Sequence, residues 1–547
     1  MMYRKHIHVV DNDSLLQVFT CYRLEEEDDW YLQSTWRNLI QVCRRWRYLV
    51  FKSPSHLDLC LLLTNDSPSL HAPSHLPPLP LVIYHSDRTR TMVRKDEDNI
   101  HIGLQQHYGR VRRVVLKAPS LSLSMWLEPM NKVFPRLEVL SLLSTTIGET
   151  NLMLPGTLQA PGLRSLVLHG VGLPRGLTFL SSSITLSTIS LTHIGASCYF
   201  HPGQLLTQLQ SLPHLEELSI GFAIPIPLPS SQGKLLSEPI PPVTLPALRQ
   251  LTFRGVDIYL DNLVAQINTP LLERLNLTLL LDLAFTLVNL AEFIHRTEGF
   301  GCLISRVIFN KDGVSIDTGG YKRGIGKLGL HINCKPLDWQ IYSATQVCST
   351  LGKVFSIIEE LTVDLNKDGM LSGWGNTLDS FMWHELLLPF IDVKKLRIGT
   401  SLTLELSQAL GSVAGRLVLE LLPDLQDLEG RLEIDPAKNA LSSFLKIRES
   451  VGRPVRVVDV RQSPCSEYVP FQYSLLTSPI THCPSISRLC PPPSWSLPVL
   501  IVSSPFMVLS IDELTTRRCS NFNTDTIYNN SLRLRLNVNG STKRSVL

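Results

Sequence analysis

The sequence predicts an α/β protein built from three parts. Residues 1–56 have the apolar spacing of short helices, and a strand motif recurs between helical segments from residue 111 to 460. Over 461–547 serine and proline are abundant and no apolar period persists. We therefore expect a short all-α unit, a proline-containing connector with the first irregular strands over 57–110, an irregular solenoid with a parallel sheet over 111–460, and a disordered C-terminal tail.

The composition excludes several classes of function. Of 547 residues, 44% are apolar and 18% are charged, and a net charge of +3 is too mild to predict a nucleic-acid partner. The most apolar stretch, 495–511, contains prolines and is shorter than the roughly 20 apolar residues of a membrane span. No apolar segment follows the N-terminus as in a secretory signal, and the 11 cysteines have no paired spacing. We expect a reduced intracellular protein, cytoplasmic or nuclear, that does not bind membranes.

The clearest helical pattern lies between Leu39 and Val50. Its apolar residues recur at steps of three and four, the period of an α-helix, and its polar residues are mostly arginine. A helix is also expected upstream, with Asn12 or Asp13 as its N-cap, and Pro54 ends the second pattern. A stripe of this kind most often packs on its own core. A unit this small buries little surface, so we expect it to be stabilised by packing against a partner or against the rest of the chain.

This segment resembles an F-box, whose pattern runs from a Leu-Leu-x-x-Phe helix through Val-Cys-x-x-Trp-Arg to Ser-Pro. The chain departs from that pattern at Val10-Asp11, where Leu-Pro is usual, and at an acidic run over residues 25–29. The residues that carry the resemblance are Val10, Leu15, Leu16, Val18, Phe19, Leu39, Val42, Cys43, Trp46, Arg47, Ser53 and Pro54.

The resemblance implies the substrate receptor of a ubiquitin ligase of the Skp/cullin/F-box (SCF) type. Its helices would dock on a Skp-family adaptor and through it on a cullin, and other subunits would supply the catalytic chemistry. We therefore expect this chain not to be an enzyme. Apolar and aromatic anchors carry most interface energy, so the expected adaptor-binding residues are Leu15, Leu16, Phe19, Val42, Trp46 and Leu49.

A motif of the form apolar-x-x-apolar-x-apolar recurs along the middle of the chain. Successive clear copies begin about 23 to 33 residues apart, close to the period of leucine-rich repeats. In each copy the last two apolar residues would alternate on a short strand and point inward, and the first would lie in the turn before it. Clear copies begin at Val111, Leu137, Leu163, Leu186, Leu215, Leu248 and Leu272, and fainter ones at Ile304, Ile358 and Val393.

As a whole the chain resembles F-box proteins with irregular leucine-rich repeats, a class numerous in fungi. The resemblance implies that the repeats bind a target protein, whose identity the sequence does not give. Solenoids usually bind along their strand surface, where residues between the repeat leucines point outward. The expected target-binding residues are Glu217, Ser219, Gln250 and Thr252.

Helices are expected between the strands, where the apolar period lengthens. The segments with this period are 201–212, 258–267, 285–295 and 383–390, and a last strand is expected near 425–430.

No catalytic or cofactor site can be assembled from the sequence. The segment that begins at Asp364 imitates a calcium loop but has Gly375 where the loop needs glutamate. The glycine-rich segment 319–327 lacks the Ser or Thr that a phosphate-binding loop requires after lysine. Cys465, His482, Cys483 and Cys490 lack the Cys-x2-Cys pair of a zinc site. We expect neither a metal nor a cofactor.

Two alternatives remain open. The N-terminal helices could merely cap the apolar end of a scaffolding repeat protein, since terminal repeats need a cap. The change of character after residue 460 could also reflect an error in the gene model rather than a genuine tail.

Overall fold

The computed structural model describes residues 10–24, 36–54, 56–57, 59–63, 79–86, 94–146, 152–174, 178–223, 242–280, 287–297, 300, 303–319, 326–366, 379–412, 417–431 and 435–459. The chain divides into two compact units, Met1–Glu467 and Tyr468–Leu547, and all described residues belong to the first. The predicted tail over 461–547 lies outside the described residues, and so do the three cysteines and one histidine considered for zinc. Most of the glycine-rich segment and the calcium-like loop after Asn366 also lie outside them.

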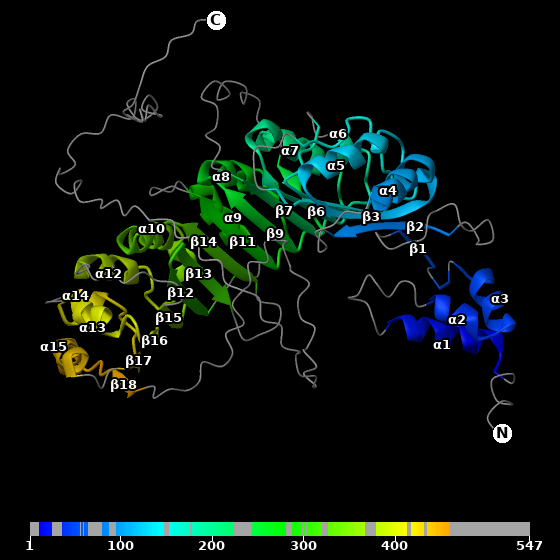
Figure 1. Cartoon of the computed structure of the whole chain (residues 1–547). Helices are drawn as coiled ribbons and strands as arrows, with labels where there is room; N and C mark the ends of the chain where they lie inside the picture. Colours follow the sequence, from blue (N-terminus) through cyan, green and yellow to red (C-terminus); the bar gives the residue numbers. More distant parts are fainter. Residues whose placement is uncertain are drawn as a thin grey trace, which may run out of the picture. The chain divides into compact units, whose positions relative to one another are not determined.

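The described unit is mixed α/β, with a large and mostly parallel sheet (Figure 1). Among the described residues, sixteen strands form this sheet in the order β1-β2-β3-β4-β5-β6-β7-β9-β11-β14-β13-β12-β15-β16-β17-β18. Their bounds are β1 Leu61–Leu63, β2 Leu81–Ser86, β3 Val111–Ala118, β4 Val139–Ser144, β5 Ser165–His169, β6 Thr188–Ile194, β7 Glu217–Phe222, β9 Gln250–Gly255, β11 Arg274–Leu280, β12 Ile304–Asn310, β13 Gly313–Gly319, β14 Lys327–Asn333, β15 Glu360–Leu365, β16 Lys395–Ile398, β17 Asp427–Gly430 and β18 Arg456–Asp459. A separate parallel pair consists of β8 Val243–Thr244 and β10 Ile267–Asn268.

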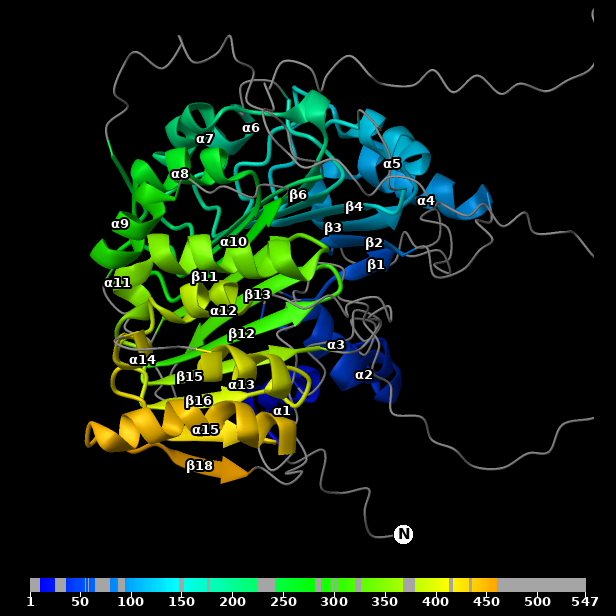
Figure 2. The ribbon, with the colours of Figure 1, turned by 90° about the vertical axis from the view of Figure 1, so that its left-hand side faces the viewer.

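Helices alternate with most of these strands. Their bounds are α1 Asn12–Leu24, α2 Trp36–Val42, α3 Arg44–Lys52, α4 Arg94–Gln106, α5 Ser120–Leu127, α6 Thr178–Ser181, α7 Pro202–Leu209, α8 Asp257–Ala265, α9 Val288–Arg296, α10 Leu337–Thr350, α11 Gly352–Phe355, α12 Ser380–Leu387, α13 Thr403–Ser412, α14 Leu417–Glu420 and α15 Asp435–Ser450. Short 3-10 turns are η3 Tyr108–Arg110, η4 Glu128–Met130 and η5 Ala196–Cys198. In Figure 2, α10, α12, α13 and α15 lie over one face of the sheet. The predicted helices at 201–212, 258–267, 285–295 and 383–390 are thus confirmed as α7, α8, α9 and α12, with small shifts of their ends.

The recurring apolar motif forms the ladder that was predicted from its spacing. Leu140 of β4 pairs with Leu166 of β5, which in turn pairs with Ile189 of β6, and the same register continues through β7, β9 and β11. These residues are fully or almost fully buried, and so is the leucine that precedes each strand, such as Leu137. The motif therefore points one face of every strand into the core.

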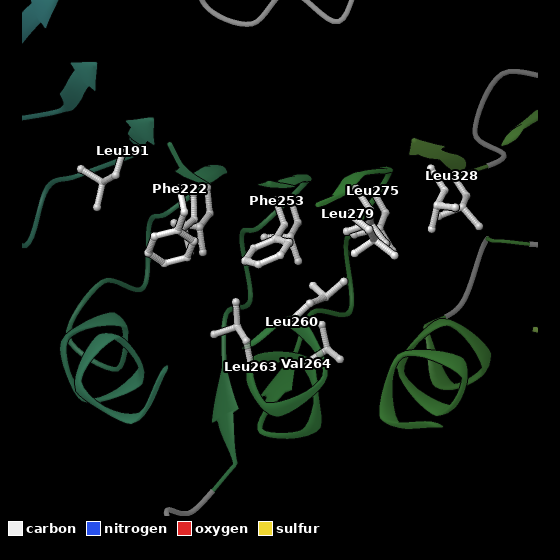
Figure 3. Packing of buried hydrophobic residues seen from close by; sticks show 14 of the residues in the cluster. Leu191, Phe222, Phe253, Leu260, Leu263, Val264, Leu275, Leu279 and Leu328 are labelled. Carbon is white, nitrogen blue, oxygen red and sulfur yellow. The ribbon is translucent and has the colours of Figure 1, made fainter. Parts of the chain in front are cut away.

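Figure 3 shows how this core is filled between sheet and helix. Phe222, Phe253, Leu275 and Leu279 extend from β7, β9 and β11, and Leu260, Leu263 and Val264 meet them from α8. Phe253 stacks on Tyr259 of α8, with ring centroids 5.7 Å apart. Each helix thus covers the apolar face of the strands beside it, which stabilises both because neither could bury its apolar residues alone.

The parallel sheet predicted over 111–460 contains an antiparallel insertion between β11 and β15. The faint copy that begins at Ile304 forms β12, but β12 does not follow β11 in the sheet. A two-residue turn, Lys311-Asp312, returns the chain as β13, which is antiparallel to both β12 and β14. A side chain at Gly313 would overlap the carbonyl of Ile332, so the start of β13 requires glycine where it passes β14. The hairpin restores the parallel direction, because β14 runs with β11 and β12 runs with β15.

Both boundaries predicted within the N-terminal helices differ from the structure. The single helix expected over 39–50 is two helices, because Cys43 is extended at φ −160° and its Sγ accepts a hydrogen bond from the Trp46 amide. The N-cap of α1 is Asp11 rather than Asn12 or Asp13: its carboxylate accepts from the Ser14 amide at 2.8 Å and from the Ser14 hydroxyl at 2.7 Å. An aspartate in place of the usual proline therefore still starts the helix.

Candidate functional sites

The first candidate site is the helical module, by which we mean α1, α2 and α3. It has a hydrophobic core of its own, distinct from the core under the sheet. The Phe19 and Trp46 rings meet edge to face in it, with centroids 4.7 Å apart and an interplanar angle of 62°. The buried members of this core are Leu15, Phe19, Leu49, Val50, Leu57, Leu59 and Leu79, and the partly buried ones include Leu16, Leu39, Ile40, Trp46, Phe51 and Leu61.

Burial separates the six residues that were expected to bind an adaptor. Leu15, Phe19 and Leu49 are 2–5% exposed and pack in the core of the module, and their contact with an adaptor stays a prediction. Leu16 and Trp46 are partly buried, and Val42 is 56% exposed. The helical period alone could not separate buried from exposed residues here. It treats 39–50 as one helix, whereas the break at Cys43 places Val42 at the end of α2, away from the apolar side of α3.

Two further apolar or aromatic side chains of the module are exposed. Val18 and Tyr48 are 56% and 59% exposed. A pocket beside Tyr48 is lined by Arg44, Arg47, Tyr48, Phe51 and Lys52. The Lys52 ammonium donates to the Tyr48 hydroxyl at 3.0 Å, which raises the pKa of that lysine. The module thus presents apolar and aromatic side chains among basic ones.

Arg45 of α3 forms hydrogen bonds with residues at the start of α1. Its guanidinium donates to the Val10 carbonyl at 2.5 Å and to Asn12 Oδ1 at 2.9 and 3.1 Å. The sequence offered no signal for this contact, since the two ends lie more than thirty residues apart.

The second candidate site is the polar face of the sheet, by which we mean the face opposite the leucine ladder. All four residues expected to bind a target lie on it. Glu217 of β7 pairs with Gln250 of β9, and Ser219 pairs with Thr252. Glu217 is exposed and the other three are partly exposed, whereas Leu218 and Leu251 between them are buried. The structure therefore brings these four side chains together as two adjacent pairs.

A row of mostly polar residues crosses the same face further along the strands. His169 pairs with Thr192, and on the other side of a register shift in β6 the pairing continues from Gly221 through Arg254, Thr278 and His331 to Ser315. A bulge in β6 adds His193 to the row, at a left-handed φ of 54°. Sequence reasoning missed this row, although Arg254 alternates with Leu251 and Phe253 and so could have been placed on the outward face.

Burial keeps the imidazoles of this row neutral. It lowers the pKa of His169 to about 4, with smaller contributions from His193 and Lys117. It likewise lowers the pKa of His331 to about 4, helped by the charge of Arg254 and opposed by Asp312. His169 Nδ1 lies 3.0 Å from the Thr192 hydroxyl and His331 Nδ1 lies 3.1 Å from the Ser315 hydroxyl. In β13, burial raises the pKa of Asp317 to about 6, opposed by Arg306.

Comparison of the chain with known protein families and curated proteins gave no match: no family model matches the chain, and no curated protein matches it significantly.

Metal-binding clusters and membrane-spanning helices were both sought among the described residues. No group of three or more histidine, cysteine, aspartate or glutamate side chains there is arranged to hold a metal ion. The helices among the described residues include none long and apolar enough to cross a bilayer.

We expect the free energy of unfolding to fall less on acidification in His169→Gln than in the wild type. Its folded pKa of about 4 lies below the ordinary value of about 6.5. Between these values the unfolded chain binds a proton that the folded chain does not, so stability falls as pH falls from about 6.5 to about 4. Asp317, with a raised pKa, opposes this trend in the same window, so the comparison must be made with the wild type.

Thermal unfolding at steps between pH 4.5 and 7 measures this effect. The variant should lose less stability than the wild type on acidification. His214→Gln, at an exposed position, should follow the wild type. Parallel curves for wild type and His169→Gln would contradict the prediction.

Proposed function

We propose that this chain is the substrate receptor of an SCF-type ubiquitin ligase. The helical module would dock on a Skp-family adaptor, and the polar face of the sheet would bind a target protein. In this role the chain itself catalyses no reaction, and the ubiquitin-transfer chemistry belongs to other subunits.

The observation that carries the proposal is the separate core of the helical module. Three short helices packed around Phe19 and Trp46 leave Val18, Val42 and Tyr48 exposed, and Tyr48 lies beside arginine and lysine side chains. Exposed apolar and aromatic residues on a unit with a small core are what a docking module needs. The F-box pattern in the same residues supports this interpretation.

We further infer that the strand–helix units are irregular leucine-rich repeats. The buried ladder formed by the motif leucines and the parallel pairing of β2 to β7 support this interpretation, as does the helix that follows most strands. The hairpin β12–β13 would then be an insertion that splits the array into two parallel series. A continuous sheet offers the long polar face that a receptor needs for a protein target.

Pull-down of the full-length chain with a purified Skp-family adaptor tests the proposal. We expect the wild type to bind and Val42→Asp to weaken binding at least about tenfold, because a charge would be buried in the interface. Val42 suits this test better than Trp46, whose ring also packs on Phe19. Val451→Asp is the matched control, since Val451 is similarly exposed at 52% but follows α15.

The alternative is a scaffolding protein whose helical module caps the sheet. One observation favours it: Leu61 of the edge strand β1 packs against both the core of the module and the core under the sheet. Absence of binding by the folded wild-type chain would overturn the receptor proposal and favour this alternative.

A further inference from the structure

Arg254 is a half-buried arginine on the polar face whose charge has no counterpart in the described residues. No carboxylate pairs with it there, and its Nε is buried without a hydrogen-bond acceptor. Burial lowers the pKa of this guanidinium, with no acidic group offsetting the effect. A buried donor without an acceptor is costly, so a ligand that accepts from this Nε would be favoured here.

Three other buried or half-buried arginines among the described residues donate to backbone carbonyls, although the Nε atoms of Arg448 and Arg113 are, like that of Arg254, buried without an acceptor. Arg448 donates to the carbonyls of Leu422, Pro423 and Leu425, at 3.0 to 3.2 Å. Arg296 donates to two carbonyls and Arg110 to one. Arg254 differs from these three because, among the described residues, its guanidinium contacts neither a backbone carbonyl nor a carboxylate.

The neighbours of Arg254 across the strands are small or polar. Gly221 on one side has no side chain and Thr278 on the other has a short one. Beyond them lie His193 and His331, close enough for the charge of Arg254 to lower the pKa of each imidazole. Neutral imidazoles donate and accept hydrogen bonds, and His193 is held in a strained left-handed conformation of the kind that clusters at binding sites.

We propose that Arg254 is the centre of an oxyanion-binding site on the polar face, which takes a phosphate or carboxylate group of a bound protein. The planar guanidinium offers the paired donors that such groups accept. Thr252, one of the residues expected to contact a target, lies two positions away on the same face of β9. That the oxyanion belongs to a target protein rests on the proposed function, whereas the site itself rests on Arg254 and its surroundings.

Thermal unfolding of the full-length chain in inorganic phosphate tests the site. Phosphate should raise Tm saturably relative to sodium chloride of equal ionic strength, because a ligand that binds the folded state stabilises it. Arg254→Gln should weaken the apparent phosphate affinity at least about tenfold, the loss expected for a charge-assisted contact. If this variant does not fold, Arg254→Lys, which keeps the charge but not the paired donors, should weaken the affinity by a smaller factor.

Arg397→Gln is the matched control for this titration. Arg397 lies on the same face in β16, but its guanidinium is already paired with Glu429 at 2.9 Å. This control should keep the full response to phosphate. A wild type without a response beyond that of chloride, or an unchanged response in the Arg254 variants, would overturn the site.

Immobilised degenerate peptides with a central phosphoserine, glutamate or glutamine then identify the source of the oxyanion. Retention of the wild type, but not Arg254→Gln, on phosphoserine assigns a phosphate, and retention on glutamate assigns a carboxylate. Retention on neither peptide, with a positive phosphate titration, would overturn the assignment to a protein ligand. Loss of adaptor binding in the pull-down would leave the titration unaffected, so failure of the two proposals can be told apart.

Discussion

Phe19→Ala is expected to unfold the helical module and leave the sheet folded. Phe19 is 2% exposed and its ring packs edge to face on Trp46, at the centre of the small core of the module. Truncation of a buried phenylalanine costs about 3–5 kcal/mol through lost burial and a residual cavity. A unit with so few buried residues has little stability in reserve, so a loss of this size should unfold it.

Hydrogen exchange of the full-length chain measures this result element by element. Peptides from α1 and α3 should lose their protection in Phe19→Ala, and peptides from β4 to β7 should keep theirs. Val18→Ala is the matched control: the neighbouring residue is 56% exposed, and its truncation should change stability by no more than about 0.5 kcal/mol. Equal protection of α1 in both variants would contradict the role given to Phe19.

This comparison also bears on the interpretation of adaptor-binding experiments. A Phe19 variant should lose adaptor binding because its module is unfolded, and that loss says nothing about contact. Val42 is exposed and absent from the core of the module, so a substitution there changes the surface without removing a packing residue. Exposure therefore decides which of the six predicted residues can report on an interface.

The repeat leucines could be predicted because one local pattern determines their environment. A leucine at alternate strand positions must face the same side, so the spacing of Leu137, Leu140 and Leu142 predicts both the strand and its buried face. The same alternation placed Glu217 and Gln250 correctly on the opposite face. Parallel register between units followed from the repetition of the pattern.

What could not be predicted depends on contacts between distant residues. The return of β13 between β12 and β14 is set by a tight turn and by the fit of Gly313 under Ile332, and the apolar pattern of β12 is compatible with either position in the sheet. Arg254 was overlooked because its significance lies in the acceptors that its surroundings lack. A property of that kind is visible only once the neighbouring strands are placed.

Arg448→Ala is expected to loosen the C-terminal end of the sheet. Arg448 lies in α15, its side chain is fully buried, and its guanidinium caps three carbonyls of the turn between α14 and β17. One of these carbonyls belongs to Leu422, which is held at a left-handed φ of 50° that a leucine rarely adopts. The guanidinium also lies over the Phe444 ring, 5.7 Å from its centroid.

Removal of this side chain takes a donor from three carbonyls and leaves a cavity beside Phe444. The Leu422 carbonyl still accepts from the Leu425 amide and the Pro423 carbonyl from Arg453, so the Leu425 carbonyl loses the most. An unsatisfied buried acceptor costs about 1–3 kcal/mol and the cavity adds to this, so we expect a total loss on the order of 3 kcal/mol. Arg448→Met, which fills much of the volume, should recover only the part due to the cavity. Arg453→Ala is the control, because exposed Arg453 donates a single bond of 3.3 Å to Pro423 in the same turn and should change stability little.

Thermal unfolding gives the total loss, and hydrogen exchange shows where it occurs. The amides of β17 and β18 should exchange faster in Arg448→Ala, because β18 pairs with the rest of the sheet only through β17, which directly follows the turn. If Arg448→Met were as stable as the wild type, the carbonyl contacts would contribute little and packing alone would explain the buried arginine. A loss common to both Arg448 variants and absent from Arg453→Ala would assign the stability of this end of the sheet to the three hydrogen bonds.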